Sequence, residues 1–127
     1  MTRLLVVDDE KDSTFVFASI LEAEGYVVDA YSDPIKALSA YKPGHYDLII
    51  LDYRMDGLNG LAFIQKVRKV DPLAKAILIT AWQPQTIGKG LQDWFIKVLA
   101  KPLPQEKLLE EVTHALNQDK LKTQSLK

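Results

Sequence analysis

Five polar residues of this 127-residue chain stand at the ends of short apolar runs, and their types suit phosphoryl-transfer or metal chemistry. They are Asp8, Asp9, Asp52, Thr80 and Lys101. A carboxylate can attack a phosphorus atom and form an acyl phosphate, while a lysine ammonium group neutralises the phosphoryl oxygens and a threonine hydroxyl donates to them. If the five side chains converge, three carboxylates share one site with a single ammonium group.

Three neighbouring carboxylates need more positive charge than one lysine supplies. Two like charges about 4 Å apart repel by on the order of 4 kcal/mol at an effective dielectric constant of about 20. Ligands that are all oxygen favour a hard divalent cation, and Mg²⁺ binds through one or two carboxylates together with water and phosphate oxygens. The acidic residues therefore predict Mg²⁺ as the cofactor of a phosphoryl-transfer site.

Whether these side chains meet depends on the elements that carry them. Five aliphatic runs are too short for helices and too apolar for half-exposed strands, which is typical of buried parallel strands. They span residues 4–7, 27–31, 48–51, 76–79 and 96–100. The carboxyl ends of parallel strands meet at one edge of an α/β sheet, where the ligand crevice lies. Four of the five runs therefore deliver a polar group to that edge.

Segments with helical spacing alternate with these runs, which indicates an α/β fold with a doubly wound parallel sheet and helices on both faces. The helices are expected to begin near Asp12-Ser13, at Asp33-Pro34, at Leu61, after Pro84 and after Pro104. In the first helix we expect a side-chain oxygen of Asp12 or Ser13 to cap the free backbone N–H groups. Its inward-facing stripe is predicted to be Val16, Phe17, Ile20 and Leu21.

The segment before the fifth run departs from the helical pattern. Gly88 and Gly90 each cost about 1 kcal/mol relative to alanine inside a helix, so we expect the fourth helix to be short or irregular. Large aromatic side chains follow at Trp94 and Phe95. Together with Trp82, they either form an exposed contact patch, as apolar patches on soluble domains often do, or turn inward to cover the core.

Length and composition limit the possible functions. The chain suffices for one domain, which we place at residues 1–118, with a short tail at residues 119–127. Sixteen basic residues against 17 acidic ones give a net charge of −1, which argues against a nucleic-acid binder held by a broad basic face. The absence of cysteine excludes thiol nucleophiles and cysteine metal sites. The first apolar run ends at Asp8, so no membrane segment and a cytoplasmic location are expected.

The sequence resembles the receiver domains of two-component response regulators, whose simplest members are the single-domain chemotaxis type. The matching stretches are LLVVDDE at residues 4–10, LIILDYRMDGLNG at 48–60, ILITA at 77–81 and LAKPL at 99–103. Their order and spacing agree with the family over essentially the whole chain. The resemblance implies a flavodoxin-like fold, with five parallel strands in the order 2-1-3-4-5 and five helices.

The resemblance implies that Asp52 accepts a phosphoryl group from a histidine kinase or a histidine phosphotransfer protein, as a step of a two-component phosphorelay. Lys101 would pair with the phosphoryl group, Thr80 would act as the switch hydroxyl, and the Lys101–Pro102 peptide bond would be cis. Such a domain catalyses only its own phosphorylation and dephosphorylation, and it signals to a protein partner by a conformational change. No direct contact with nucleic acid or membrane is expected.

For the cation, the resemblance implies that Asp9 and Asp52 bind Mg²⁺ directly, together with the backbone carbonyl group of Arg54. Asp8 would act through a bound water molecule. Arg54 stands two residues after the expected phosphoacceptor, and Trp82 stands two residues after the expected switch hydroxyl. Because these two positions influence dephosphorylation in receiver domains, both side chains are expected to shield the acyl phosphate from water.

Some positions depart from the family pattern or bear on its partners. Val98 stands three residues before Lys101, where the family typically carries an aromatic side chain that moves with the threonine. Valine is stiff at χ1 and has no ring, so the usual aromatic readout is not expected. Asp56 replaces a common proline, which leaves the phosphorylation chemistry unaffected. Phe15 is expected on the outer face of the first helix, which the resemblance assigns to kinase docking.

Two alternative functions stay open at this point. A receiver-like module that no longer switches would only scaffold partners, and Val98 with the irregular fourth helix favours it. A Mg²⁺-dependent phosphatase with an aspartyl nucleophile generally needs a second acid two residues later, where Arg54 stands. The fifth helix leaves no room for an output domain, so output is expected through a protein partner or a homodimer, unless the sequence is a fragment of a longer protein.

Overall fold

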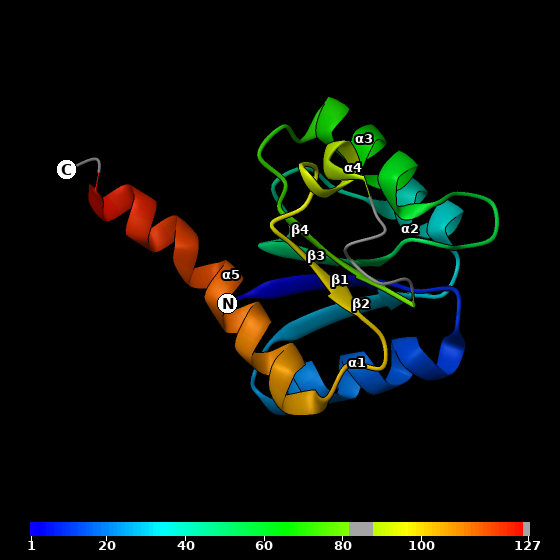
Figure 1. The fold of residues 1–127 in the computed structure, drawn as a ribbon, viewed down its shortest axis with the longest axis horizontal. Coiled ribbons are helices and arrows are strands. Elements are labelled where there is room, and N and C mark those ends of the chain that lie inside the picture. Colours follow the sequence, from blue (N-terminus) through cyan, green and yellow to red (C-terminus); the bar gives the residue numbers. More distant parts are fainter. Residues whose placement is uncertain (82–87, 126–127) are drawn as a thin grey trace.

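The computed structural model describes residues 1–81 and 88–125, with side chains described up to residue 117. A parallel sheet of five strands in the order β2-β1-β3-β4-β5 forms its centre (Figure 1). The strands are β1 (Arg3–Val7), β2 (Val27–Tyr31), β3 (Leu48–Asp52), β4 (Ala76–Thr80) and β5 (Lys97–Ala100). Each strand lies within one residue of a predicted apolar run, so the predicted strands and the strand order implied by the family resemblance are both confirmed.

Within the described ranges, four helices connect the strands and a fifth follows β5. They are α1 (Lys11–Ala23), α2 (Pro34–Ala40), α3 (Gly60–Val70), α4 (Lys89–Gln92) and α5 (Gln105–Ser125). Helices α2, α3 and α4 cover one face of the sheet, while α1 and α5 cover the other (Figure 1). This confirms the doubly wound α/β fold, and the four residues of α4 confirm a short fourth helix. None of the described helices is long and apolar enough to cross a membrane.

Side-chain caps fix the start of two helices. The carboxylate of Asp33 accepts hydrogen bonds from the backbone N–H groups of Ile35 and Lys36, and Pro34 occupies the first turn of α2. The side-chain oxygen of Asn59 likewise accepts from a backbone N–H group in the first turn of α3. Both residue types satisfy N–H groups that a helix leaves without an internal partner. The predicted start of α2 at Asp33-Pro34 is therefore confirmed.

Helix α1 starts within one residue of the predicted position, and Phe17, Ile20 and Leu21 of the predicted stripe face the core, but its cap and Val16 differ from the prediction. It begins at Lys11, without a side-chain cap from Asp12 or Ser13. The Thr14 hydroxyl lies 2.6 Å from the backbone oxygen of Asp8 and 3.0 Å from that of Glu10. These contacts hold the turn before α1, and the helix begins one residue before Asp12. Thr14 is thus buried with its hydroxyl satisfied, and Val16, predicted to face inward, is 48% exposed.

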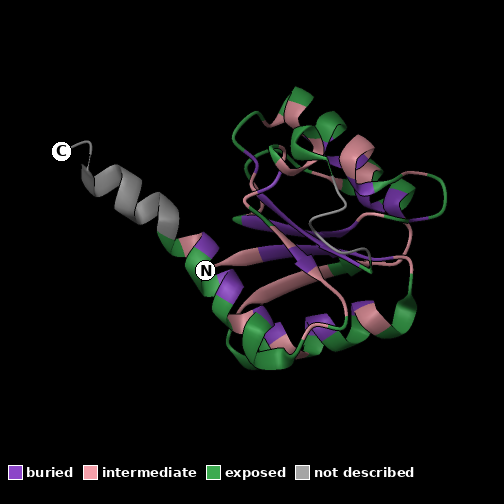
Figure 2. Cartoon of the chain, in the orientation of Figure 1, coloured by how far each residue is buried: buried purple, intermediate pink, exposed green. Residues whose placement is uncertain are grey.

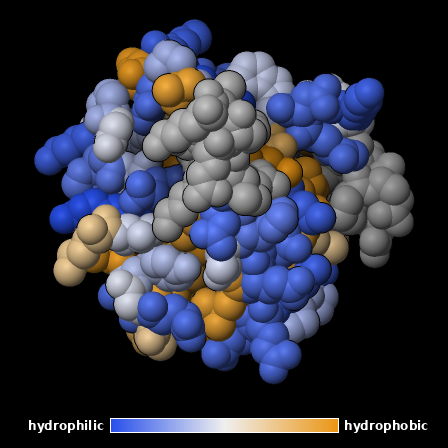
Figure 3. Space-filling view, turned by 90° about the vertical axis from the view of Figure 1, so that its left-hand side faces the viewer, coloured by the Kyte–Doolittle hydropathy of each residue, from blue (hydrophilic) through white to orange (hydrophobic). Residues whose placement is uncertain are grey.

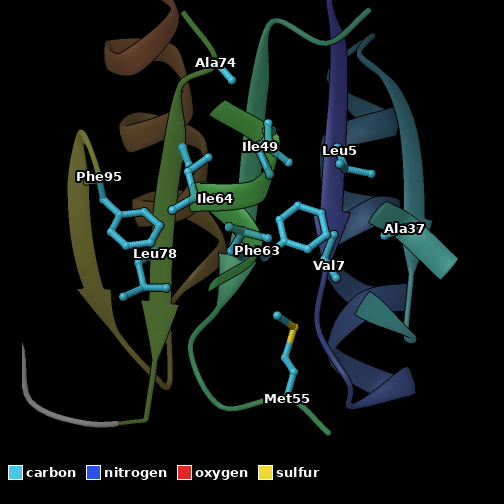
Figure 4. Packing of buried hydrophobic residues seen from close by; sticks show 13 residues of the cluster. Leu5, Val7, Ala37, Ile49, Met55, Phe63, Ile64, Ala74, Leu78 and Phe95 are labelled. Carbon is cyan, nitrogen blue, oxygen red and sulfur yellow. The ribbon is translucent and has the colours of Figure 1, made fainter. Parts of the chain in front are cut away.

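Two hydrophobic clusters fill the space on the two faces of the sheet (Figure 2). On the α3 side, Phe95 is buried beside Ile64 and Leu78 (Figure 4). Trp94 is half-buried against the same cluster. Of the two interpretations of these aromatic residues, the inward one is therefore correct for Phe95, whereas Trp82 lies outside the described residues.

Few large apolar side chains remain exposed among the described residues. Figure 3 shows one face of the molecule as mostly hydrophilic, with apolar residues in small separate areas. The large hydrophobic residues with the highest exposure are Met1, Phe15, Val16, Ile35, Val70 and Leu73. Phe15 is 73% exposed, as its helical position predicts.

A close backbone approach places the start of α3 against the end of β3. The backbone N–H group of Gly60 donates to the backbone oxygen of Tyr53 at 2.8 Å. A Cβ atom at position 60 would lie 2.6 Å from the backbone oxygen of Asp52 and 3.1 Å from a methyl group of Leu78. The absence of a side chain at Gly60 therefore sets the distance between α3 and the strand that carries Asp52.

We expect Gly60→Ala to destabilise the fold by about 1–3 kcal/mol, because the new methyl group would push α3 away from a rigid backbone atom. Chemical denaturation measures the change in the free energy of unfolding. Gly90→Ala is the matched control, because a Cβ atom there meets nothing within 4 Å. The control should leave the stability unchanged or raise it by up to about 1 kcal/mol. Equal effects of the two substitutions would contradict this interpretation.

Candidate functional site

The carboxyl ends of β1, β3 and β5 bring three of the predicted side chains into direct contact. The Nζ atom of Lys101 lies 2.8 Å from Oδ2 of Asp8 and 3.2 Å from Oδ2 of Asp52. Asp8 and Asp52 are 2% and 8% exposed, so little water screens their charges. The ammonium group therefore bridges two buried carboxylates that extend from neighbouring strands.

Asp9 completes an acidic cluster beside this bridge. One carboxylate oxygen from each of Asp8, Asp9 and Asp52 lies within 4.8 Å of the other two. The backbone N–H group of Asp56 lies 3.2 Å from Oδ2 of Asp9 and orients its carboxylate from the loop after β3. Three oxygen ligands around one ammonium group leave an excess of negative charge, and this donor set fits a hard divalent cation such as Mg²⁺.

The position of Asp8 depends on the turn that enters α1. The Oδ1 atom of Asp8 accepts a hydrogen bond from the backbone N–H group of Glu10 at 3.0 Å, and its Oδ2 atom accepts from Lys101. The hydroxyl group of Thr14 also donates to the backbone oxygen of Asp8. Both carboxylate oxygens of Asp8 are therefore already oriented by partners within the chain.

The charges and the burial of the cluster shift the pKa values of Asp52 and Lys101. Burial, followed by the negative charge of Asp8, raises the pKa of Asp52 from 3.8 to about 6, and Lys101 opposes this shift. Burial lowers the pKa of Lys101, but its hydrogen bond and charge interaction with Asp8, and then those with Asp52, outweigh burial and raise it overall. At neutral pH Lys101 is thus protonated, and Asp52 is ionised but more basic than an ordinary carboxylate.

Thr80 lies beside Lys101 at the ends of β4 and β5. The backbone N–H group of Lys101 donates to the backbone oxygen of Thr80 at 2.7 Å, and Thr80 is 1% exposed. The Lys101–Pro102 peptide bond is cis, which confirms that expectation. Val98 is half-buried, pairs with Leu78 of β4 and contacts the α3-side cluster.

Arg54 occupies the loop beside the acidic cluster. Its side chain is exposed, and together with Asp9 and Asp56 it lines a pocket next to the aspartates. Arg54 thus lies next to the acidic cluster, as the sequence analysis expects. Trp82, the second residue expected to shield the site, lies outside the described residues.

Sequence reasoning missed two supporting groups of the site. The Thr14 hydroxyl and the Asp56 backbone N–H group orient Asp8 and Asp9. A threonine four residues after Glu10 in a first helical turn is a detectable pattern, because its hydroxyl can bond the carbonyl group one turn back. The contact of Asp56 has no comparable pattern, since a backbone N–H group carries no residue-specific signal.

Comparison with known proteins gives an independent result. A family model described as the response regulator receiver domain matches residues 4–113. The chain is 34% identical over 126 residues to the uncharacterized transcriptional regulatory protein YkoG of Bacillus subtilis, covering 98% of this chain and 55% of that protein. It is 33% identical over 122 residues to protein CcdB of the same organism, covering 91% and 98%. The chain thus spans about half of YkoG and nearly all of CcdB.

A further relative and a solved structure extend this comparison. The chain is 32% identical over 119 residues to the chemotaxis protein CheY of Treponema pallidum, covering 90% of this chain and 82% of that protein. The structure is also similar to the response regulator TrrA of Thermotoga maritima, which was crystallised in complex with Mg²⁺-BeF. That similarity has 33% identity and a TM-score of 0.80 and covers 91% of this chain and 99% of the other.

We expect Asp52→Asn to raise the melting temperature by a few degrees at a pH of about 7.5 when divalent cations are removed. The pKa of Asp52 is about 6 in the folded chain and 3.8 ordinarily, so between these values the folded chain binds a proton that the unfolded chain does not. Stability therefore falls as the pH rises through this window, and asparagine avoids the loss.

Thermal unfolding in the presence of a chelator, at several pH values between about 4 and 8, measures this difference. The advantage of the Asp52→Asn variant should be small near the lower limit and largest above a pH of about 6. Asp93→Asn, at an exposed position, serves as the control and should show no such trend. A stability difference that does not change with pH would contradict the shifted pKa of Asp52.

Proposed function

Because the chain belongs to the response regulator receiver domain family, which acts in phosphorylation-based two-component signalling, we propose that Asp52 is its phosphoacceptor. The donor is a histidine kinase or a histidine phosphotransfer protein. The observation that carries the proposal is the contact of Asp52 with Lys101 inside the cluster formed with Asp8 and Asp9. A buried, ionised carboxylate beside a fixed ammonium group is suited to attack a phosphoryl group.

In the proposed reaction, an oxygen of Asp52 attacks the phosphorus atom of the donor phosphohistidine. A phosphorus–oxygen bond forms and the phosphorus–nitrogen bond breaks, with its electron pair remaining on the imidazole nitrogen, which then takes a proton. Lys101, already bonded to Asp52, neutralises charge on the transferring oxygens. The product is an acyl phosphate, and the chain catalyses only its own phosphorylation and dephosphorylation.

Mg²⁺ is the proposed cofactor of this reaction. Asp9 and Asp52 would hold the ion directly with the backbone carbonyl group of Arg54, and Asp8 would act through a water molecule. When bound, Mg²⁺ supplies positive charge that neutralises phosphoryl oxygens. The oxygen atoms of the three aspartates within 4.8 Å of one another support this assignment, as does the similarity to the Thermotoga protein in complex with Mg²⁺-BeF.

Thr80 is the proposed switch residue. Its position beside Lys101, at the end of the strand next to β3, suits a hydroxyl group that hydrogen-bonds a phosphoryl group on Asp52. Such a bond would move Thr80 toward the site. Because Val98 replaces the usual aromatic residue, the resulting change would reach a protein partner without an aromatic side chain at that position.

The proposed docking surface for the phosphoryl donor includes the exposed side of α1. Phe15 and Val16 are 73% and 48% exposed. Val16 also lines a pocket, which other residues of α1 form together with Lys101, Pro102 and Leu103. A donor protein that covers this pocket would approach the side of the site on which Lys101 contacts Asp52.

We expect a single phosphoryl adduct when the chain is incubated with Mg²⁺ and acetyl phosphate, because the small donor needs no protein docking. Intact mass spectrometry detects the adduct. It should disappear in Asp52→Asn and persist in Asp56→Asn, a control that changes an exposed carboxylate in the same loop. A chelator should also abolish it.

Other outcomes of this experiment identify the alternatives. An adduct that persists in Asp52→Asn would overturn the assignment of the phosphoacceptor. Absence of any adduct in the wild-type chain would favour a non-switching scaffold. Rapid hydrolysis of added phosphate esters, dependent on Asp52, would instead identify a Mg²⁺-dependent phosphatase.

We expect Phe15→Ala to slow phosphoryl transfer from a histidine kinase by about tenfold, which corresponds to about 1.4 kcal/mol of lost contact energy. The kinase is chosen from a panel as the fastest donor to the wild-type chain. Ile35→Ala is the matched control, since Ile35 is an exposed apolar residue on α2. Acetyl phosphate should modify all variants equally. Unchanged transfer from the kinase to Phe15→Ala would overturn the docking surface.

A further inference from the structure

A further pocket lies between α3 and Trp94, and none of the three clustered aspartates lines it. Its lining residues are Ala62, Gln65, Lys66, Arg68, Lys69 and Trp94. A helix rises about 1.5 Å per residue, so Lys66 lies roughly 9 Å along α3 from the end that meets Asp52. The proposed phosphorylation chemistry therefore does not account for this pocket.

The pocket concentrates positive charge in a chain of almost neutral total charge. Lys66, Arg68 and Lys69 all line it, whereas α3 contains no acidic residue. In the described part of the chain, none of these three cations forms an ion pair. The net charge of the whole chain is −1, so this local excess is a property of one surface.

Arg68 is held in place by groups that leave its charge uncompensated. Its Nε atom donates to the backbone oxygen of Ala74 at 3.0 Å, and its guanidinium carbon lies 5.6 Å from the centre of the Trp94 ring. Burial lowers the pKa of Arg68, which means that the guanidinium group has lost part of its hydration. A partly desolvated, oriented cation forms stronger bonds to a carboxylate than a mobile one in water.

Helix α3 is fixed at both ends, which makes this surface rigid before any partner binds. At its start, Gly60 donates to the backbone oxygen of Tyr53. At its end, Oδ2 of Asp71 accepts from the hydroxyl group of Tyr41 at 2.6 Å and from the backbone N–H group of Gly44 at 3.1 Å. Asp71 is thereby engaged with the α2–β3 loop, and a rigid surface loses little conformational entropy on binding.

Apolar side chains beside the cations indicate the kind of partner. Ala62 and the half-buried ring of Trp94 line the same pocket as the three cations and give it an apolar part. A mixed basic and apolar surface suits a peptide with carboxylate and apolar side chains better than inorganic phosphate, which has no apolar part. Nucleic acid would require a broader basic surface than one pocket.

We propose that this α3 surface, formed by Lys66, Arg68, Lys69 and Trp94, is a docking site for an acidic, partly apolar segment of a protein partner. The inference describes the chemistry of the downstream partner, so its role in signal output rests on the proposed function. The docking itself depends on the surface and not on the phosphoryl group.

The test uses the full chain as bait for a display library of random 16-residue peptides. Selected peptides should carry net negative charge together with apolar residues. Fluorescence anisotropy should show that Lys66→Glu/Lys69→Glu weakens their binding at least tenfold. Lys36→Glu/Lys42→Glu, a matched charge reversal at exposed lysines outside α3, should change it less than twofold. In amide NMR spectra the indole N–H signal of Trp94 should shift on binding.

Several results would overturn the proposal. One is the selection of peptides without acidic residues, and another is an equal effect of the two double variants. A third is displacement of bound peptide by inorganic phosphate or duplex DNA at a concentration equal to that of the peptide. The fourth is self-association of the wild-type chain that Lys66→Glu/Lys69→Glu abolishes. Phosphorylation of Asp52 by acetyl phosphate is measured on the same samples. Normal phosphorylation without peptide binding contradicts the docking site alone, whereas peptide binding without phosphorylation contradicts the proposed function alone.

Discussion

The interaction on which the site depends is the buried bridge from Lys101 to Asp8 and Asp52. Neighbouring parallel strands β1 and β3 end in carboxylates that water barely reaches, and such charges destabilise a fold unless a partner compensates them. The partner comes from β5, at the edge of the sheet. Strand order and chemistry are therefore linked, because the crossovers that give this order also deliver the ammonium group.

Much of this arrangement was predictable because its determinants are local. Apolar runs located the strands, the common edge of a parallel sheet located the polar residues, and Asp33-Pro34 located a helix start. The prediction was wrong for Val16 of α1, because the hydroxyl of Thr14 bonds a carbonyl group six residues earlier and allows a polar side chain to be buried in its place. Periodicity counts such a threonine as polar, so it assigned Val16 to the inner face instead.

The aromatic residues before β5 show a different limit of sequence reasoning. A run of large apolar side chains is compatible with an exposed patch and with a core contact, and only the neighbouring elements decide between them. Helix α4 is so short that none of its residues is buried, and Phe95 fills the space above Leu78 and Ile64. Leu91, Trp94 and Val98 pack against the same cluster, and Trp94 remains partly accessible at the surface beside Arg68.

Because of the close approach of Gly60, the side chain and the backbone oxygen of Asp52 have different functions. The carboxylate carries the proposed chemistry, whereas the backbone oxygen sets how near α3 approaches. In genetic terms, alleles at position 52 that change the side chain should encode folded proteins with altered signalling. Alleles at position 60 should act through protein abundance and be sensitive to temperature. A screen for loss of signalling would therefore find both positions, and growth at low temperature would restore only the second class.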